Sequence, residues 1–187
     1  MIQRSRNSAA KPLANQRALL VLARADSGRL PMSLEEINPI ALATEARELI
    51  GVLAEEKQQE ISVRTPDLPV PKVIADRELL RLALLNLLDN AIRYSPAGTP
   101  ITMSVNSEGG VIAIDVIDRG PGIPARHQKK IFERFYRVDK ARSRANGGAG
   151  IGLAVARSVL ELQHGSLQMS SQEGQGSTFH IRLPAAL

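Results

Sequence analysis

The fold is decided by residues 76–93, DRELLRLALLNLLDNAIR, which predict a helix that is apolar almost all round. A helix of this kind has to be buried inside the protein. Asn86, Asn90 and Arg93 nevertheless follow one another at i, i+4 and i+7, which places them along one face. Because an unpartnered buried amide costs about 1–3 kcal/mol, the stripe indicates a ligand. Asn side-chain oxygens are suitable ligands for Mg²⁺, and Arg93 is suited to bind a phosphate. The alternative to a ligand site is a solvated polar stripe with an ion pair between Asp89 and Arg93.

Outward from this helix, the spacing of apolar residues predicts a sheet with helices beside it. The chain has runs of strands between helices, without strict alternation, which argues for an α+β fold. We expect a mixed sheet of about five strands with three helices on one face. The expected helices cover 13–26, 39–57, 76–93, 125–132 and 151–163, and the expected strands cover 61–64, 72–74, 101–106, 111–118, 166–170 and 177–183.

Length and composition exclude several classes of protein. The 187 residues suffice for one domain and a short appendage, and the absence of cysteine excludes disulfide scaffolds and thiolate zinc sites. The net charge of +5 comes from residues 1–30, which hold six basic residues and one acid, so the body is neutral. This placement argues against a nucleic-acid-binding module. Within the body, residues 119–144 hold nine basic residues against two acids, which indicates a local anionic partner or a solvated loop.

The expected strand at 111–118 runs into Asp118-Arg-Gly-Pro-Gly-Ile-Pro124. An aspartate at the end of a strand accepts hydrogen bonds, for example from an exocyclic amine. Gly120 and Gly122 allow the backbone to approach a ligand closely. Taken alone, this stretch is more often only a turn.

A glycine-rich stretch, Gly147-Gly-Ala-Gly-Ile-Gly-Leu153, leads into the last expected helix. Exposed N–H groups and the helix dipole favour an anion at such a helix start. No Gly-Lys-Ser/Thr follows, and the preceding residues do not form a strand, so neither a Walker A loop nor a dinucleotide fingerprint is present. The stretch is weak evidence by itself.

The order of these pieces is specific. Asn86-x-x-x-Asn90, Asp118-x-Gly120-x-Gly122, Ile131-Phe-Glu-Arg-Phe-Tyr-Arg137 and Gly148-x-Gly150-x-Gly152 follow one another. This order resembles the N, G1, F and G2 boxes of the ATP-binding catalytic domain of bacterial sensor histidine kinases, in the superfamily that includes DNA gyrase B and Hsp90. The resemblance covers about 38–187 and implies a two-layer α/β sandwich, the Bergerat fold. Asn rather than Glu at position 86 resembles the histidine-kinase branch.

The resemblance implies Mg-ATP as the ligand and assigns roles to the residues. Asn90 would bind Mg²⁺, Asn86 would support metal and phosphates, and Asp118 would accept from the adenine amino group. The basic residues Arg93 and Arg137 would contact phosphates and act in catalysis with Asn86. A lid at 138–149 would hinge on its glycines. The remaining nucleotide-binding residues that it implies are Tyr94, Gly120, Gly122, Ile123, Gly148, Gly150, Ile151, Gly152, Leu153 and Thr178.

The resemblance also divides the chain. Residues 1–30 resemble the end of a dimerisation helix, 31–37 a linker and 38–187 the catalytic domain. None of His127, His164 and His180 is followed by an acid, so no phosphoacceptor pattern is present. We therefore expect a soluble fragment from the cytoplasmic portion of an inner-membrane sensor, which binds nucleotide without phosphorylating itself.

In the full-length protein, expected to be a homodimer, the γ-phosphate would pass to a histidine of the dimerisation domain. A response regulator would be the further partner, and no nucleic acid is expected. The oligomeric state of the fragment stays open. The alternatives are an ATP-hydrolysing member of the same superfamily and a domain that only binds another protein.

Overall fold

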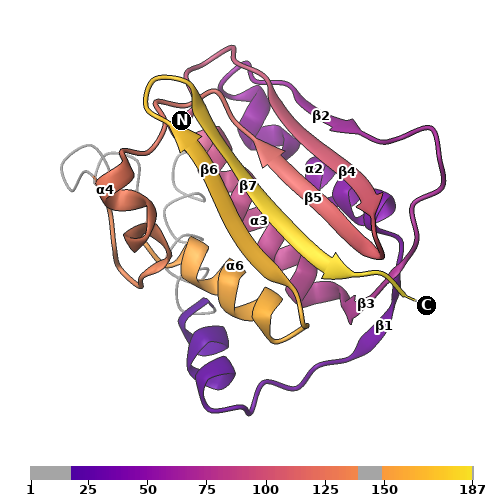
Figure 1. The fold of residues 1–187 in the computed structure, drawn as a ribbon. Helices are drawn as coiled ribbons and strands as arrows, with labels where there is room; N and C mark the ends of the chain where they lie inside the picture. The colour runs from indigo at the N-terminus through magenta and orange to yellow at the C-terminus, as the bar shows by residue number, and fades with distance from the viewer. Residues whose placement is uncertain (1–17, 139–148, 187) are drawn as a thin grey trace, which may run out of the picture.

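The computed structural model describes residues 18–138 and 149–186. Its centre is a five-stranded sheet with the order β2-β4-β5-β7-β6 (Figure 1). β2 lies parallel to β4, and all other neighbours are antiparallel, so the sheet is mixed as expected. The strands are β2 (Ile61–Arg64), β4 (Ile101–Glu108), β5 (Val111–Ile117), β6 (Ser166–Gln172) and β7 (Gly176–Pro184).

Three helices cover one face of this sheet and leave the other open (Figure 1). They are α2 (Pro39–Glu55), α3 (Arg77–Tyr94) and α6 (Gly152–Glu161). Alternation along the strands buries one side chain in two against them, including Met103, Ile114 and Ile181. The α+β prediction with helices on one face is therefore confirmed.

Side chains stabilise the start of α2 and the end of α3. Asn38 Oδ1 accepts hydrogen bonds from the N–H groups of Ile40 and Ala41, at 2.9 and 3.1 Å, at the start of α2. At the end of α3, the Lys57 ammonium donates to the carbonyl of Ile92 at 2.5 Å and to that of Ser95 at 2.8 Å. Burial lowers the pKa of Lys57. The end of α2 therefore fixes the C-terminal half of α3, which carries the stripe of polar residues.

Two elements differ from the prediction. The segment expected to be a linker contains β1 (Leu34–Ile37), which pairs antiparallel with β3 (Val73–Asp76) in a separate two-stranded sheet. The helix expected at 125–132 divides into α4 (Ala125–Gln128) and the 3₁₀ helix η1 (Lys130–Phe132).

The N-terminal helix is described from residue 18 and continues to residue 26; the expected residues 13–17 lie outside the described part. Leu22 is 1% exposed and belongs to the core, so this helix packs on the domain. Asp26 forms an ion pair with Arg134 at 2.5 Å. In the described ranges, no helix is both long and apolar enough to span a bilayer.

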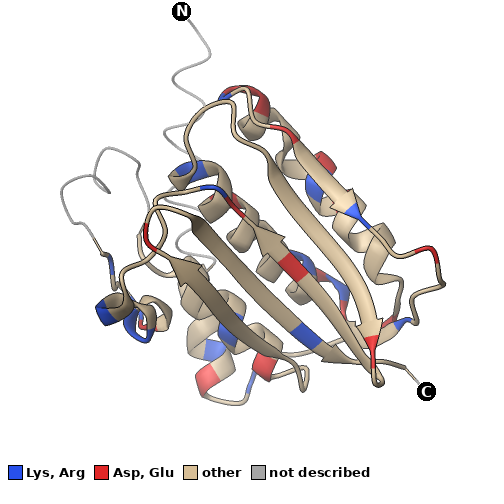
Figure 2. Ribbon diagram, turned by 45° about the horizontal axis from the view of Figure 1, so that its top comes forward, with Lys and Arg blue, Asp and Glu red and all other residues tan. Residues whose placement is uncertain are grey.

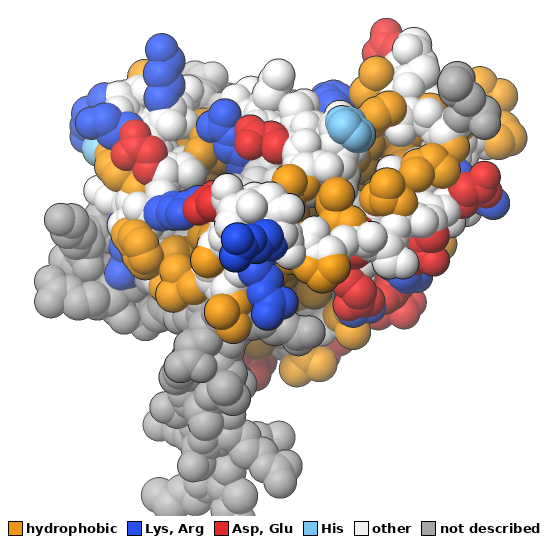
Figure 3. All heavy atoms as spheres, turned by 90° about the horizontal axis from the view of Figure 1, so that it is seen from below, with side chains coloured by type: hydrophobic (Ala, Val, Ile, Leu, Met, Phe, Trp, Pro, Cys, Tyr) orange, Lys and Arg blue, Asp and Glu red, His pale blue; other side chains and the backbone are white. Residues whose placement is uncertain are grey.

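Charged side chains are distributed unevenly. Figure 2 shows Lys and Arg gathered around α4 and η1, in agreement with the basic stretch in the sequence. On the face seen in Figure 3, by contrast, basic, acidic and apolar side chains are interspersed.

Candidate functional site

Asp118 follows β5 and lies on the helix-covered side of the sheet, only 8% exposed. Its Oδ1 accepts hydrogen bonds from the Gly120 N–H at 2.7 Å and the Ser177 N–H at 3.3 Å. Burial nevertheless raises the pKa of Asp118, because the two backbone hydrogen bonds lower it by less. No described Lys or Arg forms an ion pair with it. The carboxyl group is therefore a buried acceptor suited to a neutral donor such as an amino group.

Two glycines have no room for a side chain at the loop after Asp118. Gly122 lies in the loop itself, and Gly176 is the first residue of β7. A methyl group on Gly122, whose φ is +70°, would lie 2.1 Å from the carbonyl oxygen of Gln172. A methyl group on Gly176 would lie 2.2 Å from the carbonyl oxygen of Asp118. The turn between β6 and β7 therefore holds this loop in place, and with it the carboxyl group.

The polar stripe of α3 lies beside the start of α6. Asn86, Asn90 and Arg93 are half-buried. The Asn86 amide donates to the Leu82 carbonyl at 2.9 Å, and its Oδ1 is directed at α6, since a methyl group on Gly152 would lie 2.8 Å from it. Arg93 also forms the ion pair with Asp89, at 2.6 Å, that the solvated-stripe alternative expects.

The start of α6 has no side-chain cap in the described part of the chain. Its N-cap residue, Ile151, makes no side-chain capping hydrogen bond. The first N–H groups of a helix have no partner within the helix, and they favour an anion. This helix start faces the Asn86 amide, so N–H donors and an amide oxygen suited to a cation lie side by side here.

The glycine stretch is attached to the segment that precedes it. Phe135 N–H donates to the Gly150 carbonyl at 2.8 Å, and a methyl group on Gly150 would lie 2.9 Å from the Tyr136 carbonyl oxygen. Next along the chain, Arg137 Nη2 is buried and has no hydrogen-bond partner among the described residues. A buried guanidinium donor without a partner is costly, so this geometry suits an anionic ligand.

The structure places the other predicted residues around these groups. Tyr94 is 45% exposed at the end of α3, with its carbonyl beside Gly120. The Ile123 N–H donates to Ser171 Oγ at 2.8 Å. Ile151 is buried and Leu153 packs against the core. Gly148 and nearly all of the predicted lid lie outside the described residues.

Thr178 is not brought to the Asp118 carboxylate. It pairs with Ile117 and shares the open face of the sheet with His180, whereas the adjacent Ser177 lies on the Asp118 side, 7% exposed. Ser177 donates its N–H to Asp118, as described above, and its hydroxyl lies 3.0 Å from that of Ser171. Sequence reasoning missed Ser177, although the alternation of β7 counted from buried Phe179 identifies it.

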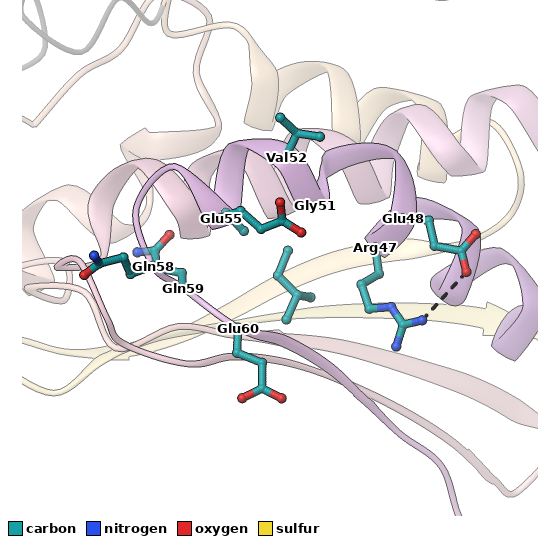
Figure 4. Close-up of a pocket in the computed structure, with 10 residues that line it drawn as sticks. Arg47, Glu48, Gly51, Val52, Glu55, Gln58, Gln59 and Glu60 are labelled. Carbon is teal, nitrogen blue, oxygen red and sulfur yellow. Dashed lines mark ion pairs between the residues drawn. The ribbon is translucent and has the colours of Figure 1, made fainter.

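A separate hollow lies between α2 and the chain leading to β2 (Figure 4). Its volume is about 660 Å³. Three carboxylates, of Glu48, Glu55 and Glu60, line it, and Arg47 is the only Lys or Arg in the lining. None of the predicted site residues takes part. An acidic hollow repels phosphates, so it does not compete with the Asp118 site for a nucleotide.

Comparison with known proteins agrees with this geometry. A profile of the family described as "Histidine kinase-, DNA gyrase B-, and HSP90-like ATPase" matches residues 75–187. The chain belongs to this family. The expectation of a histidine-kinase catalytic domain is thereby confirmed, because the similar proteins are themselves sensor kinases.

Among the relatives, the sensor-like histidine kinase SenX3 of Mycolicibacterium smegmatis is 45% identical over 157 residues, covering 83% of this chain and 40% of SenX3. The adaptive-response sensory kinase SasA of Thermosynechococcus vestitus is 37% identical over 167 residues, covering 89% of this chain and 43% of SasA. The chain thus spans about 40% of the length of these curated relatives.

Among solved structures, full-length ShkA in complex with AMPPNP superposes with a TM-score of 0.83 at 29% identity, covering all of this chain and 39% of ShkA. The mycobacterial sensor histidine kinase MprB superposes with a TM-score of 0.68 at 28% identity, covering 82% of this chain and 98% of the MprB chain.

Proposed function

We propose that this chain binds Mg-ATP and, within a sensor kinase, donates the γ-phosphate to a histidine of a dimerisation domain. The observation that carries the proposal is the buried Asp118 carboxyl group, which accepts backbone N–H groups and has no ion pair with a described Lys or Arg. The kinase relatives and the likeness to ShkA, solved with AMPPNP, support it.

Adenine would be recognised by Asp118. The exocyclic amine of adenine is a neutral hydrogen-bond donor, and a buried carboxyl group with a raised pKa is a suitable acceptor for it. The Ser177 N–H donates to this carboxyl group, and the hydroxyl groups of Ser177 and Ser171 would add polar atoms to the pocket. The exposed ring of Tyr94 would cover one side of the base.

The triphosphate would lie between α3 and α6. The uncapped start of α6 and the buried Arg137 guanidinium supply donors for phosphate oxygens. The amide oxygens of Asn86 and Asn90 are hard ligands that fit Mg²⁺, which usually keeps several waters and also binds phosphates. When bound, the ion would neutralise charge on the phosphates.

Phosphoryl transfer requires little covalent work from the protein, so positioning and charge neutralisation set the rate. Arg93, Arg137 and the glycine N–H groups would hold the triphosphate, with the γ-phosphate directed outward. In this proposal the acceptor histidine, the response regulator and the membrane-bound sensor lie outside this chain, and the domain acts on the cytoplasmic side.

The test is a calorimetric titration of ADP and a non-hydrolysable ATP analogue, with and without Mg²⁺. Asp118→Ala should weaken binding of both nucleotides about 10–100-fold, because a charged or buried hydrogen bond is worth about 1.5–3 kcal/mol. Asn90→Ala should instead remove the gain in affinity that Mg²⁺ provides.

Two exposed positions supply matched controls. Asp67→Ala removes a carboxylate from a loop, and Asn106→Ala removes an amide on the open face that donates only to Ser104 Oγ, at 2.9 Å. Both variants should bind like the wild type. A folded wild-type protein that binds neither nucleotide would contradict the proposal, and steady release of phosphate from ATP would favour an ATPase.

A further inference from the structure

The open face of the sheet carries a serine, a histidine and an aspartate in hydrogen-bond contact. They come from three neighbouring strands: Ser170 from β6, His180 from β7 and Asp115 from β5. Ser170 Oγ lies 2.9 Å from His180 Nε2, and His180 Nδ1 lies 3.0 Å from Asp115 Oδ1. Their side chains lie on the face of the sheet opposite to that of the Asp118 carboxyl group, and none of the three is among the residues proposed to bind the nucleotide.

The hydrogen bonds fix the direction of the proton transfer. An ionised carboxylate only accepts, so His180 Nδ1 has to donate to Asp115. In a neutral imidazole this leaves Nε2 without a proton, and Nε2 then accepts from the Ser170 hydroxyl. This is the arrangement in which a histidine acts as a base toward a serine and an aspartate orients the imidazole.

The serine is also accessible. Ser170 is exposed and lines a groove of about 480 Å³ at the end of the sheet. Ile117 and Thr178 give this groove an apolar part, Arg119 adds a positive charge, and Asp118 and Ser177 of the proposed adenine site also line it. A small acyl group fits the apolar part, and a negatively charged end on that group fits Arg119.

We propose that Ser170 is a nucleophile that is acylated by small activated esters with an anionic acyl group. Ser170 Oγ would bond to the acyl carbon while its proton passes to His180 Nε2. The ester C–O bond would then break, and the leaving alcohol would take that proton. Water, activated by the same imidazole, would hydrolyse the acyl-serine to release the acid, so ester and water become acid and alcohol.

Arg182 modifies this arrangement. Its Nη1 donates to the same Asp115 oxygen, at 2.6 Å, and so neutralises part of the carboxylate charge. Asp115 therefore acts mainly by orienting the imidazole. We expect a reactivity well below that of a dedicated hydrolase, visible first as covalent labelling.

The experiment uses a fluorophosphonate, which reacts with activated serines, followed by peptide mass spectrometry. The label should appear on Ser170, disappear in Ser170→Ala and form at least tenfold more slowly in His180→Gln, as expected for loss of a general base. Asp115→Asn should also slow labelling. The matched control is Ser104→Ala, on the same face but with an Asn106 partner in place of a histidine, and it should label like the wild type.

A second measurement tests the acyl preference. Hydrolysis of the p-nitrophenyl monoester of succinate should exceed that of p-nitrophenyl acetate, and Arg119→Gln should remove the difference. The proposal is overturned if wild-type Ser170 takes up no label, if it reacts no faster than Ser104, or if His180→Gln reacts at the wild-type rate. Thermal melting of each variant verifies that the fold is intact.

Discussion

Asp115 and Asp118 lie three residues apart in the sequence, yet their carboxyl groups lie on opposite faces of the sheet and have different partners. Asp118 faces the helices, accepts only backbone N–H groups and has its pKa raised by burial. Asp115 faces outward and is held by His180 and Arg182. Because side chains alternate along a strand, an odd spacing puts identical residues on opposite faces. The face, more than the residue type, determines what each carboxyl group can do.

The same contrast extends over the whole sheet. Toward the helices the strands present fully buried apolar side chains, such as Ile114. Away from the helices they present hydroxyls, amides and charged groups, such as Thr102 and Asp115. The first face holds the fold together and shields one binding site, whereas the second stays in contact with solvent.

The largest effect should come from truncating the buried face. Ile114→Ala should lower the free energy of unfolding by about 2–5 kcal/mol, since it leaves a cavity in a close-packed core. Thr102→Ala, on the neighbouring strand but on the open face, should change it by less than about 1 kcal/mol. Urea denaturation of both variants measures the difference. Equal losses would mean that the two faces contribute alike.

A smaller effect is expected from removing the charge at Asp118. Since burial raises the pKa of this carboxyl group in the folded protein, its ionised form opposes folding at neutral pH, and stability is regained as acid protonates it. Asp118→Asn should therefore be more stable than the wild type at pH 7, and the advantage should shrink toward pH 4. Thermal melting across this range provides the measurement. If the stability advantage of Asp118→Asn over the wild type grew on acidification, the predicted direction of the pKa shift would be wrong.

The smallest effect should follow removal of the charge at Asp115. Its side chain is 22% exposed and that of Arg182 is 35% exposed, so solvent screens the pair. Asp115→Asn should cost at most about 1 kcal/mol, and the cost should decrease in 1 M salt. Melting temperatures at low and high salt measure this. A loss comparable to that of Ile114→Ala would show that the open face is also structural.

Much of this architecture could be predicted from the sequence. Apolar residues alternate or cluster strongly enough to predict the strands β2, β4, β5, β6 and β7. The nearly continuous apolar surface of α3 predicts that helix equally well. β1 was missed because three of its four residues are exposed, so its Leu-Glu-Glu-Ile sequence shows no alternation. Its pairing of Leu34 with Asp76 joins segments far apart in the sequence, which no local pattern contains.

The candidate site shows the same limit. The glycines and Asp118 could be predicted as candidates because their chemistry depends on local sequence. The sequence prediction named Thr178, whereas the structure places Ser177 on the side of Asp118; that distinction depends on which face of β7 each residue occupies, and a shift of one residue reverses the faces. The orientation of Asn86 toward α6 also depends on how two distant helices pack. Sequence alone specified the residue types, and packing specified their partners.

The contact between Gly152 and Asn86 determines how the Asn86 amide is oriented. One position begins α6 and the other lies midway along α3, yet the amide oxygen occupies the space that a methyl group on Gly152 would need. A larger residue at 152 would therefore turn the Asn86 amide away from α6, so glycine at the start of α6 sets the direction in which the α3 amide oxygen points. A substitution at 152 would change the orientation of Asn86 without changing Asn86 itself.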